Sequence, residues 1–231
     1  MRTLQERTSL SIIIPTLNAA ETLAQTLEAA FVSAIVDEII VADGGSTDTT
    51  VSVAKMAGAR VVLAPRGRGP QLAAGASAAL NNWLLFMHAD CRLEPAWEMA
   101  VSVFLAAPAA AARAGYFDLA LDDAVPAARR VERIVAWRCR RLALPYGDQG
   151  LLIARALYEE VGGFAPLPLM EDVDLVRRLG RRRVVPIGAR CFASAQRYRR
   201  DGYLRRPLRN LLCLGLYFAG VPPARIVRLY G

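Results

Sequence analysis

Two aspartates, Asp43 and Asp90, follow apolar segments that are predicted to be strands, 37–42 (DEIIVA) and 83–87 (WLLFM). A carboxylate at a strand end can accept hydrogen bonds from a nucleobase or ribose. One carboxylate, together with substrate phosphates and waters, also suits Mg²⁺ or Mn²⁺. Asp90 is the metal candidate, whereas Asp43 is equally compatible with capping the next helix.

Other reactive groups stand near these two. His88 is the only histidine of the chain, and a ribose contact or a packed ring is favoured over direct metal ligation. Arg68 lies in the glycine-rich loop 65–70 (PRGRGP), where it could reach phosphate oxygens. Glu171 and Asp172 begin a predicted helix, so they could simply complement its dipole. They could also raise one another's pKa and supply a general base.

The elements that position these residues alternate along the first half of the chain. Strands are predicted at 10–14, 37–42, 60–64 and 83–87, with helices between them, the last at 71–82. Such βαβ units form a parallel sheet, and ligands bind beyond the carboxyl ends of its strands. The polar loops 15–18, 43–48, 65–71 and 88–90 share that edge. Asn18 with Glu21 resembles a capping box at the first helix.

The second half is less regular. The pattern predicts helices at 94–107, 127–144 and 171–182, strands at 116–121 and 184–187, and a helical tail from Tyr203 to the prolines at 222–223. We therefore expect an α/β fold, with a mostly parallel sheet flanked by helices and a helical C-terminal segment. Its expected division is a main domain, 1–202, and an extension, 203–231, packed on it or at an interface.

Composition narrows the class of protein. The charge of +8 permits phosphates, anionic lipid or nucleic acid as partners. No apolar run is long enough to span a bilayer, and the charged stretch 1–7 does not open a secretory signal. A cytoplasmic protein is expected. The arginine-rich segments 127–144 and 203–218 leave open peripheral contact with the inner face of a membrane, packing on the domain, or self-association.

The motifs resemble those of family-2 glycosyltransferases with the GT-A fold, over roughly residues 9 to 180. The matching segments are 11–18 with Glu21, 39–48, 85–90, 161–164 and 170–175. A narrower likeness, carried by 67–71, 88–90, 146–150 and 220–223, is to the selenodomain-associated or arsenosugar-biosynthesis glycosyltransferases.

This resemblance implies an inverting, metal-dependent transfer of one sugar from a nucleotide-diphosphate donor to a small-molecule or lipid-linked acceptor. Asp43 and Asp90 would hold the donor together, Asp90 through Mg²⁺ or Mn²⁺. Asp172 would be the catalytic base, with Glu171 beside it. Gly147, Asp148, Gln149 and Gly150 would lie near the transferred sugar or acceptor. The nucleotide-sugar-binding residues would be Pro15, Thr16, Asn18, Glu21, Asp43, Gly45, Ser46, Arg68, Gln71, His88, Ala89 and Asp90.

Two departures from the family pattern matter. His88 replaces the first acid of the DxD motif, so the metal would rest on Asp90 and phosphates. The QxxRW motif of processive members is missing, since 196–200 (QRYRR) lacks the tryptophan, and a single transfer per acceptor is expected.

Alternatives from other classes stay open. A nucleotidyltransferase of related fold would normally place a basic glycine-rich loop after the first strand, but residues 15–18 contain no lysine or arginine. A non-catalytic nucleic-acid-binding protein fits the charge, but an aromatic platform is missing, so no nucleic-acid partner is expected.

Overall fold

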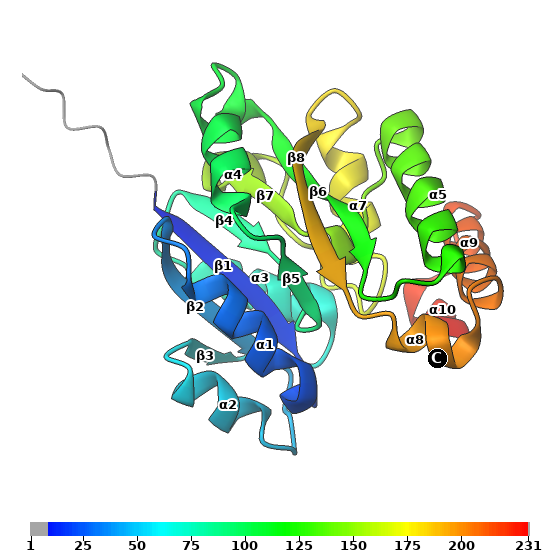
Figure 1. The fold of residues 1–231 in the computed structure, drawn as a ribbon, viewed down its shortest axis with the longest axis horizontal. Helices are drawn as coiled ribbons and strands as arrows, with labels where there is room; N and C mark the ends of the chain where they lie inside the picture. Colours follow the sequence, from blue (N-terminus) through cyan, green and yellow to red (C-terminus); the bar gives the residue numbers. More distant parts are fainter. Residues whose placement is uncertain (1–8, 231) are drawn as a thin grey trace, which may run out of the picture.

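The computed structural model describes residues 9–230, and the charged stretch 1–7 lies outside the described residues. Its strands form one eight-stranded sheet in the order β3-β2-β1-β4-β7-β6-β8-β5 (Figure 1). The strands are β1 (Leu10–Thr16), β2 (Val36–Asp43), β3 (Arg60–Leu63), β4 (Trp83–Phe86), β5 (Cys91–Leu93), β6 (Ala114–Leu121), β7 (Leu151–Ala154) and β8 (Val184–Ala193).

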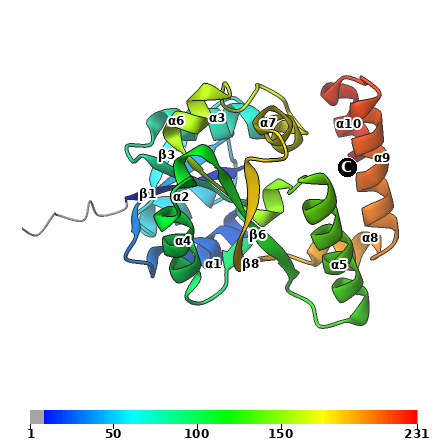
Figure 2. The ribbon, with the colours of Figure 1, turned by 90° about the horizontal axis from the view of Figure 1, so that it is seen from above.

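Helices cover both faces of this sheet. Figure 2 shows α3, α6 and α7 over one face and α1 and α4 over the other, with α9 and α10 at one end of the molecule. The α-helices are α1 (Ala20–Phe31), α2 (Thr50–Met56), α3 (Arg68–Ala78), α4 (Trp97–Ala106), α5 (Pro126–Leu142), α6 (Arg155–Glu160), α7 (Glu171–Leu179), α8 (Gln196–Asp201), α9 (Arg205–Phe218) and α10 (Pro223–Tyr230). The 3₁₀ turns are η1 (Ala110–Ala112) and η2 (Gly147–Gln149).

The first half confirms the predicted parallel arrangement. β1 pairs in parallel with β2 and β4, and β2 pairs in parallel with β3. Ile12, Ile13 and Ile14 are completely buried, because helices cover both sides of this central strand. A continuous β-branched run is what such a doubly covered strand requires. The carboxyl ends of β1, β2 and β4 therefore share one edge, as expected.

Close packing of α3 on this sheet depends on a glycine. A Cβ built on Gly75 would lie 2.4 Å from Cγ2 of Ile13, well inside van der Waals contact. The missing side chain lets the helix backbone approach β1 closely. This approach fixes where the first turn of α3, which carries Arg68, meets the edge of the sheet.

The second half of the sheet is mixed. β7 pairs antiparallel with both β4 and β6, β5 pairs antiparallel with β8, and β6 pairs in parallel with β8. Five elements of this half were not predicted from the sequence: β5, β7, α6, α8 and α10. The strand predicted at 184–187 in fact runs to Ala193, because a register irregularity beside Tyr116 accommodates Pro186 within the ladder.

Two local predictions were wrong. Asn18 does not cap α1, since it has a φ of 50° and its Oδ1 accepts a hydrogen bond from the Thr47 N–H at 2.8 Å. Asp48 reaches the start of α1 instead, with Oδ2 accepting from the Ala20 N–H at 3.2 Å. The loop predicted at 65–70 ends early, because Arg68 is the first residue of α3. A cap supplied from another loop could not be read from local spacing.

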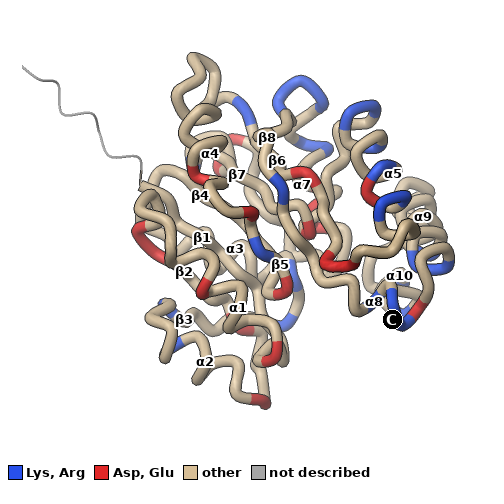
Figure 3. The backbone as a smooth tube through the Cα atoms, in the orientation of Figure 1, with Lys and Arg blue, Asp and Glu red and all other residues tan. Residues whose placement is uncertain are grey.

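The C-terminal helices pack beside the start of α7. Leu169, Met170 and Val173 form a small apolar cluster with Cys213 and Leu214 of α9, and Ile226 of α10 joins it. Arginines gather over α5, α9 and the turn between α7 and β8 (Figure 3). Within residues 9–230, every helix is too short or too polar to cross a membrane.

Candidate active site

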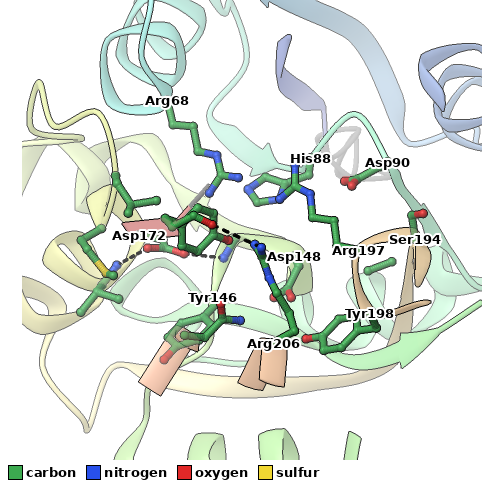
Figure 4. A pocket seen from close by; sticks show the side chains of 17 residues that line it. Arg68, His88, Asp90, Tyr146, Asp148, Asp172, Ser194, Arg197, Tyr198 and Arg206 are labelled. Carbon is green, nitrogen blue, oxygen red and sulfur yellow. Dashed lines mark hydrogen bonds between the residues drawn. The ribbon is translucent and has the colours of Figure 1, made fainter. Parts of the chain in front are cut away.

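A pocket that is open to solvent lies beyond the carboxyl end of β4. Figure 4 shows Arg68, His88, Asp90, Asp148 and Asp172 converging on it. The start of α7 forms one wall and the C-terminal helices another. Its remaining lining residues are Tyr146, Gly147, Leu169, Met170, Val173, Ala193, Ser194, Arg197, Tyr198, Arg206, Asn210 and Tyr230.

The segment His88-Ala89-Asp90 follows β4 directly and enters the pocket. One ligand atom each from His88, Asp90 and Cys91 lies within 4.8 Å of the others. Burial and the nearby Arg68 guanidinium lower the pKa of His88 to about 4, against the opposing effect of Asp90. The imidazole is therefore neutral near pH 7. An aromatic nitrogen and a carboxylate oxygen fit a divalent cation, and Asp90 and His88 are the residues that would hold it.

Asp43 lies two strands from Asp90 along the sheet, because β1 separates β2 from β4. Its carboxylate is buried and held by its own loop. Oδ1 accepts from the hydroxyls of Thr16 at 3.0 Å and Ser46 at 2.5 Å, and Oδ2 accepts from the N–H groups of Gly45 at 2.9 Å and Ser46 at 2.8 Å. Although burial opposes ionisation, the hydrogen bonds from Ser46, Thr16 and Gly45 keep the pKa of Asp43 below its usual value.

Two other residues predicted near the nucleoside, Asn18 and Gln71, support these loop ends and do not line the pocket. Asn18 donates its backbone N–H to the Ser46 hydroxyl at 2.8 Å, which ties the β1 and β2 loops together. The Gln71 side-chain amide donates to the carbonyls of Thr16 at 2.6 Å and Ala42 at 2.9 Å, so that side chain braces strand ends. Pro15 is the sixth residue of β1, and Glu21 stands exposed in the first turn of α1.

Two guanidinium groups reach the pocket without an ion-pair partner among the described residues, Arg68 of α3 and Arg197 of α8. Burial opposes the charge of Arg68, but Tyr230, Glu171 and Asp172 outweigh it and raise its pKa. Figure 4 shows both side chains directed toward His88. Unpaired guanidinium groups beside a metal-binding carboxylate suit phosphate oxygens.

The structure separates the predicted pair of acids at the start of α7. Asp172 lines the pocket, with Oδ2 accepting from the Gly147 N–H and Oδ1 from the Val173 N–H, each at 2.7 Å. These bonds fix the carboxylate and leave other lone pairs free. Glu171 is completely buried and lines a smaller, mainly apolar pocket behind it. Burial and the neighbouring Asp172 raise the pKa of Glu171 to about 7, against Arg68.

The residues predicted on the acceptor side, in and after the turn η2, do not all line the same pocket. Asp148 lines the main pocket, Gly150 lines the smaller one, and Gly147 lines both. Burial raises the pKa of Asp148 to about 6, with Arg138 opposing the shift. Gln149 is buried, and its amide donates to the Phe117 carbonyl at 3.0 Å, so this side chain holds the turn in place.

Several pocket residues were missed from the sequence. Arg197 and Tyr198 line the pocket and belong to the segment 196–200, in which the sequence shows only a departure from the processive motif. Arg206, Asn210 and Tyr230 come from α9 and α10, and their helical pattern gave no sign that they face a site. The local signal that could have identified Arg197 and Tyr198 is an arginine and a tyrosine that follow a strand.

A mixed sheet flanked by helices, with acids and arginines at the carboxyl ends of its strands, is the fold of GT-A glycosyltransferases. The sequence model for glycosyl transferase family 2 matches residues 11–148, and the chain belongs to this family. The protein is therefore a glycosyltransferase.

Curated relatives agree with this assignment over part of their length. An uncharacterized glycosyltransferase of Rickettsia felis is 39% identical over 82 residues, which are 35% of this chain and 28% of the relative. A PGL/p-HBAD biosynthesis glycosyltransferase of Mycobacterium bovis is 36% identical over 104 residues, 41% of each chain. The chain thus spans well under half the length of the relatives it matches.

Solved structures share the fold over most of the chain. Glucosyl-3-phosphoglycerate synthase of Mycobacterium tuberculosis, in complex with Mn²⁺, UDP-glucose and phosphoglyceric acid, has a TM-score of 0.63 at 22% identity, over 93% of this chain and 81% of that one. Mannosyl-3-phosphoglycerate synthase of Rubrobacter xylanophilus has a TM-score of 0.59 at 19% identity, over 92% and 75%. These likenesses establish the fold.

Proposed function

We propose that this glycosyltransferase moves one sugar from a nucleotide-diphosphate donor to an acceptor hydroxyl, with inversion and with help from a divalent metal. The observation that carries the proposal is the pocket in which Asp90, Asp172, Arg68 and Arg197 converge. The complex of the structural neighbour glucosyl-3-phosphoglycerate synthase with Mn²⁺ and UDP-glucose supports a donor of this kind.

The proposed reaction is a single displacement. The acceptor oxygen attacks the anomeric carbon while its proton passes to Asp172, and the bond to the diphosphate breaks with its electron pair on the leaving oxygen. Arg68 and Arg197 stabilise the charge that develops there. A bound divalent metal would neutralise the same diphosphate. Attack from the face opposite the leaving group gives inversion.

The backbone bonds to Asp172 support its role as the base. They orient the carboxylate toward the pocket. The apolar cluster that contains Met170 and Val173 holds the start of α7 in place. Asp148 is the nearest alternative, because its raised pKa is closer to neutral. The proposal assigns it to the sugar or acceptor, since it belongs to the turn that also positions Asp172.

The acceptor is proposed to be a small molecule or the head of a lipid. Large apolar side chains are exposed on α5 and α9, among arginines, which favours peripheral contact with anionic membranes. The examples are Ile134, Trp137, Leu208, Leu211 and Leu212. Vesicles with and without anionic lipid, sedimented at low salt, test this. Failure of the protein to sediment with the anionic vesicles would restrict the proposal to small acceptors.

A donor screen followed by two variants tests the function. Nucleotide-sugars with Mg²⁺ or Mn²⁺ are screened by thermal shift, since a bound donor stabilises the native state. Asp172→Asn is expected to keep the donor-induced shift and lose turnover. Asp90→Ala is expected to lose both donor hydrolysis and transfer. Full activity in Asp90→Ala would contradict the metal assignment, and equal loss of donor binding and turnover in Asp172→Asn would make Asp172 structural.

A further inference from the structure

His88 replaces the first acid of the DxD motif and lies at a position from which a side chain could bind the metal. One of its ring nitrogens, a carboxylate oxygen of Asp90 and Sγ of Cys91 lie within 4.8 Å of one another. His88 and Asp90 are partly exposed to the pocket, whereas Cys91 is buried. The Cys91 thiol is buried and donates weakly to the Asp148 carbonyl at 3.6 Å and to Asp90 Oδ1 at 3.8 Å, so the imidazole and the carboxylate are the two groups presented to a ligand.

The backbone of this segment is fixed on both sides. The Thr26 hydroxyl of α1 donates to the Ala89 carbonyl at 2.9 Å, between the two candidate ligands. The Ser194 N–H at the end of β8 donates to the Asp90 carbonyl at 3.1 Å. One anchor comes from helix α1 and the other from the residue that follows β8. They hold His88 and Asp90 at a set separation before anything binds.

The ring of His88 is also fixed by its neighbour. A Cβ built on Gly147 would lie 2.4 Å from Nε2 of His88, so the imidazole packs directly on the glycine backbone. The same Gly147 donates its N–H to Asp172. A side chain that is already ordered loses little entropy when it binds a metal. This packing therefore favours metal binding by His88, and it also explains why position 147 has no side chain.

We infer that His88 is a ligand of the catalytic metal beside Asp90, and that this site binds Mn²⁺ in preference to Mg²⁺. This inference rests on the proposed function. Mg²⁺ prefers oxygen ligands and keeps much of its water, whereas later divalent ions accept imidazole nitrogen more readily. Replacing an acid by an imidazole also removes one negative charge. Arg68 and Arg197 stand nearby, so the metal binds together with a diphosphate rather than alone.

The single histidine makes this inference directly testable. Mn²⁺ is bound to protein without a histidine tag, in the presence of inorganic pyrophosphate as a diphosphate without base or sugar. Electron spin-echo envelope modulation detects imidazole nitrogen coupled to Mn²⁺. Any such coupling can come only from His88, because the chain contains one histidine.

The variants are chosen to separate ligation from packing. His88→Ala is expected to abolish the nitrogen coupling and to weaken Mn²⁺ binding by about tenfold or more, since even outer-shell partners of a metal ligand contribute that much. His88→Asp restores two acids and is expected to lower the ratio of Mn²⁺ to Mg²⁺ affinity. Gly147→Ala should displace the ring and weaken the coupling. Arg92→Ala, an exposed neighbour on β5 outside the pocket, is the matched control and should leave the coupling unchanged.

The outcomes distinguish this inference from the proposed function, because no readout depends on sugar transfer. Bound Mn²⁺ without imidazole coupling, or an unchanged affinity ratio in His88→Asp, overturns the role of His88. Failure to bind Mn²⁺ with pyrophosphate overturns it as well. Nitrogen coupling in a protein that transfers no sugar from any donor would support the metal site and refute the transfer.

Discussion

Glu171 begins α7 with a completely buried side chain, and neither carboxylate oxygen has a hydrogen-bond partner among the described residues. Burial is the main cause that raises its pKa from 4.5 to about 7, the nearby Asp172 adds to it, and Arg68 opposes it. The folded state therefore binds this proton more tightly than the unfolded state. The stability that follows is present below about pH 4.5 and is lost as the pH rises through about 7.

Glu171→Gln removes this titration while keeping the size of the side chain. From the two pKa values, the wild type should lose roughly 2 kcal/mol of unfolding free energy relative to the variant between about pH 5 and 8. For a domain of this size, that difference corresponds to roughly 4–8 °C in melting temperature. The variant should therefore be the more stable protein at pH 8, and the gap should narrow in acid.

The assay is thermal and urea unfolding of both proteins across this pH range at constant ionic strength. Glu159→Gln is the matched control, because Glu159 is exposed and its only ion pair in the described chain is a 4.0 Å contact with Arg155. Its stability should follow that of the wild type at every pH. Parallel pH curves for wild type and Glu171→Gln would refute the reasoning, since they would mean that Glu171 titrates alike in the folded and unfolded states.

Two further predictions concern the loops at the sheet edge. Gly69→Ala should destabilise the protein by about 1–3 kcal/mol and weaken donor binding. The new Cβ would lie 2.1 Å from the Ala165 carbonyl and would push away the turn of α3 that carries Arg68. A donor-induced thermal shift equal to that of the wild type would contradict this. Asp43→Asn should cost about 1–3 kcal/mol at neutral pH, because an amide nitrogen cannot accept the backbone N–H groups of the loop. The pKa of Asp43 is lowered in the folded state, so its stabilisation is lost as the pH falls, and the deficit of Asp43→Asn in urea unfolding should shrink in acid; a deficit independent of pH would exclude the carboxylate as its source.

The first half of the fold could be predicted because its signals are local. The strand from Leu10, the strand before Asp43 and the strand before His88 are short apolar runs that end in polar loops, and parallel sheets bury such runs on both sides. Their common edge followed from topology alone. The position of Asp90 in a pocket at that edge follows the same rule.

The rest could not be predicted because it depends on contacts between distant segments. β7 looks like any short apolar run, and only its pairing with β4 and β6 makes it a central strand. The cap of α1 comes from Asp48, 28 residues along the chain from Ala20. Arg206 and Tyr230 reach the pocket only because an apolar cluster seats α9 and α10 beside α7. No periodicity in the sequence reports that placement.

The hydrogen bonding of the two aspartates suggests different tasks for them. Within residues 9–230, all four hydrogen bonds to the Asp43 carboxylate come from its own loops. Its oxygens therefore hold the β1 and β2 loop ends in shape. Polar groups around Asp90 are still able to bind a ligand. Among the described residues, Arg68 and Arg197 have no ion-pair partner, and Asp148 Oδ1 is buried without a hydrogen bond. A buried carboxylate oxygen without a hydrogen bond is costly, and guanidinium groups without an ion pair attract anions, so this pocket is where we expect a charged ligand to bind. A base or ribose would then meet the backbone of the loop that Asp43 organises, while the charged part of the donor would meet Asp90 and the arginines.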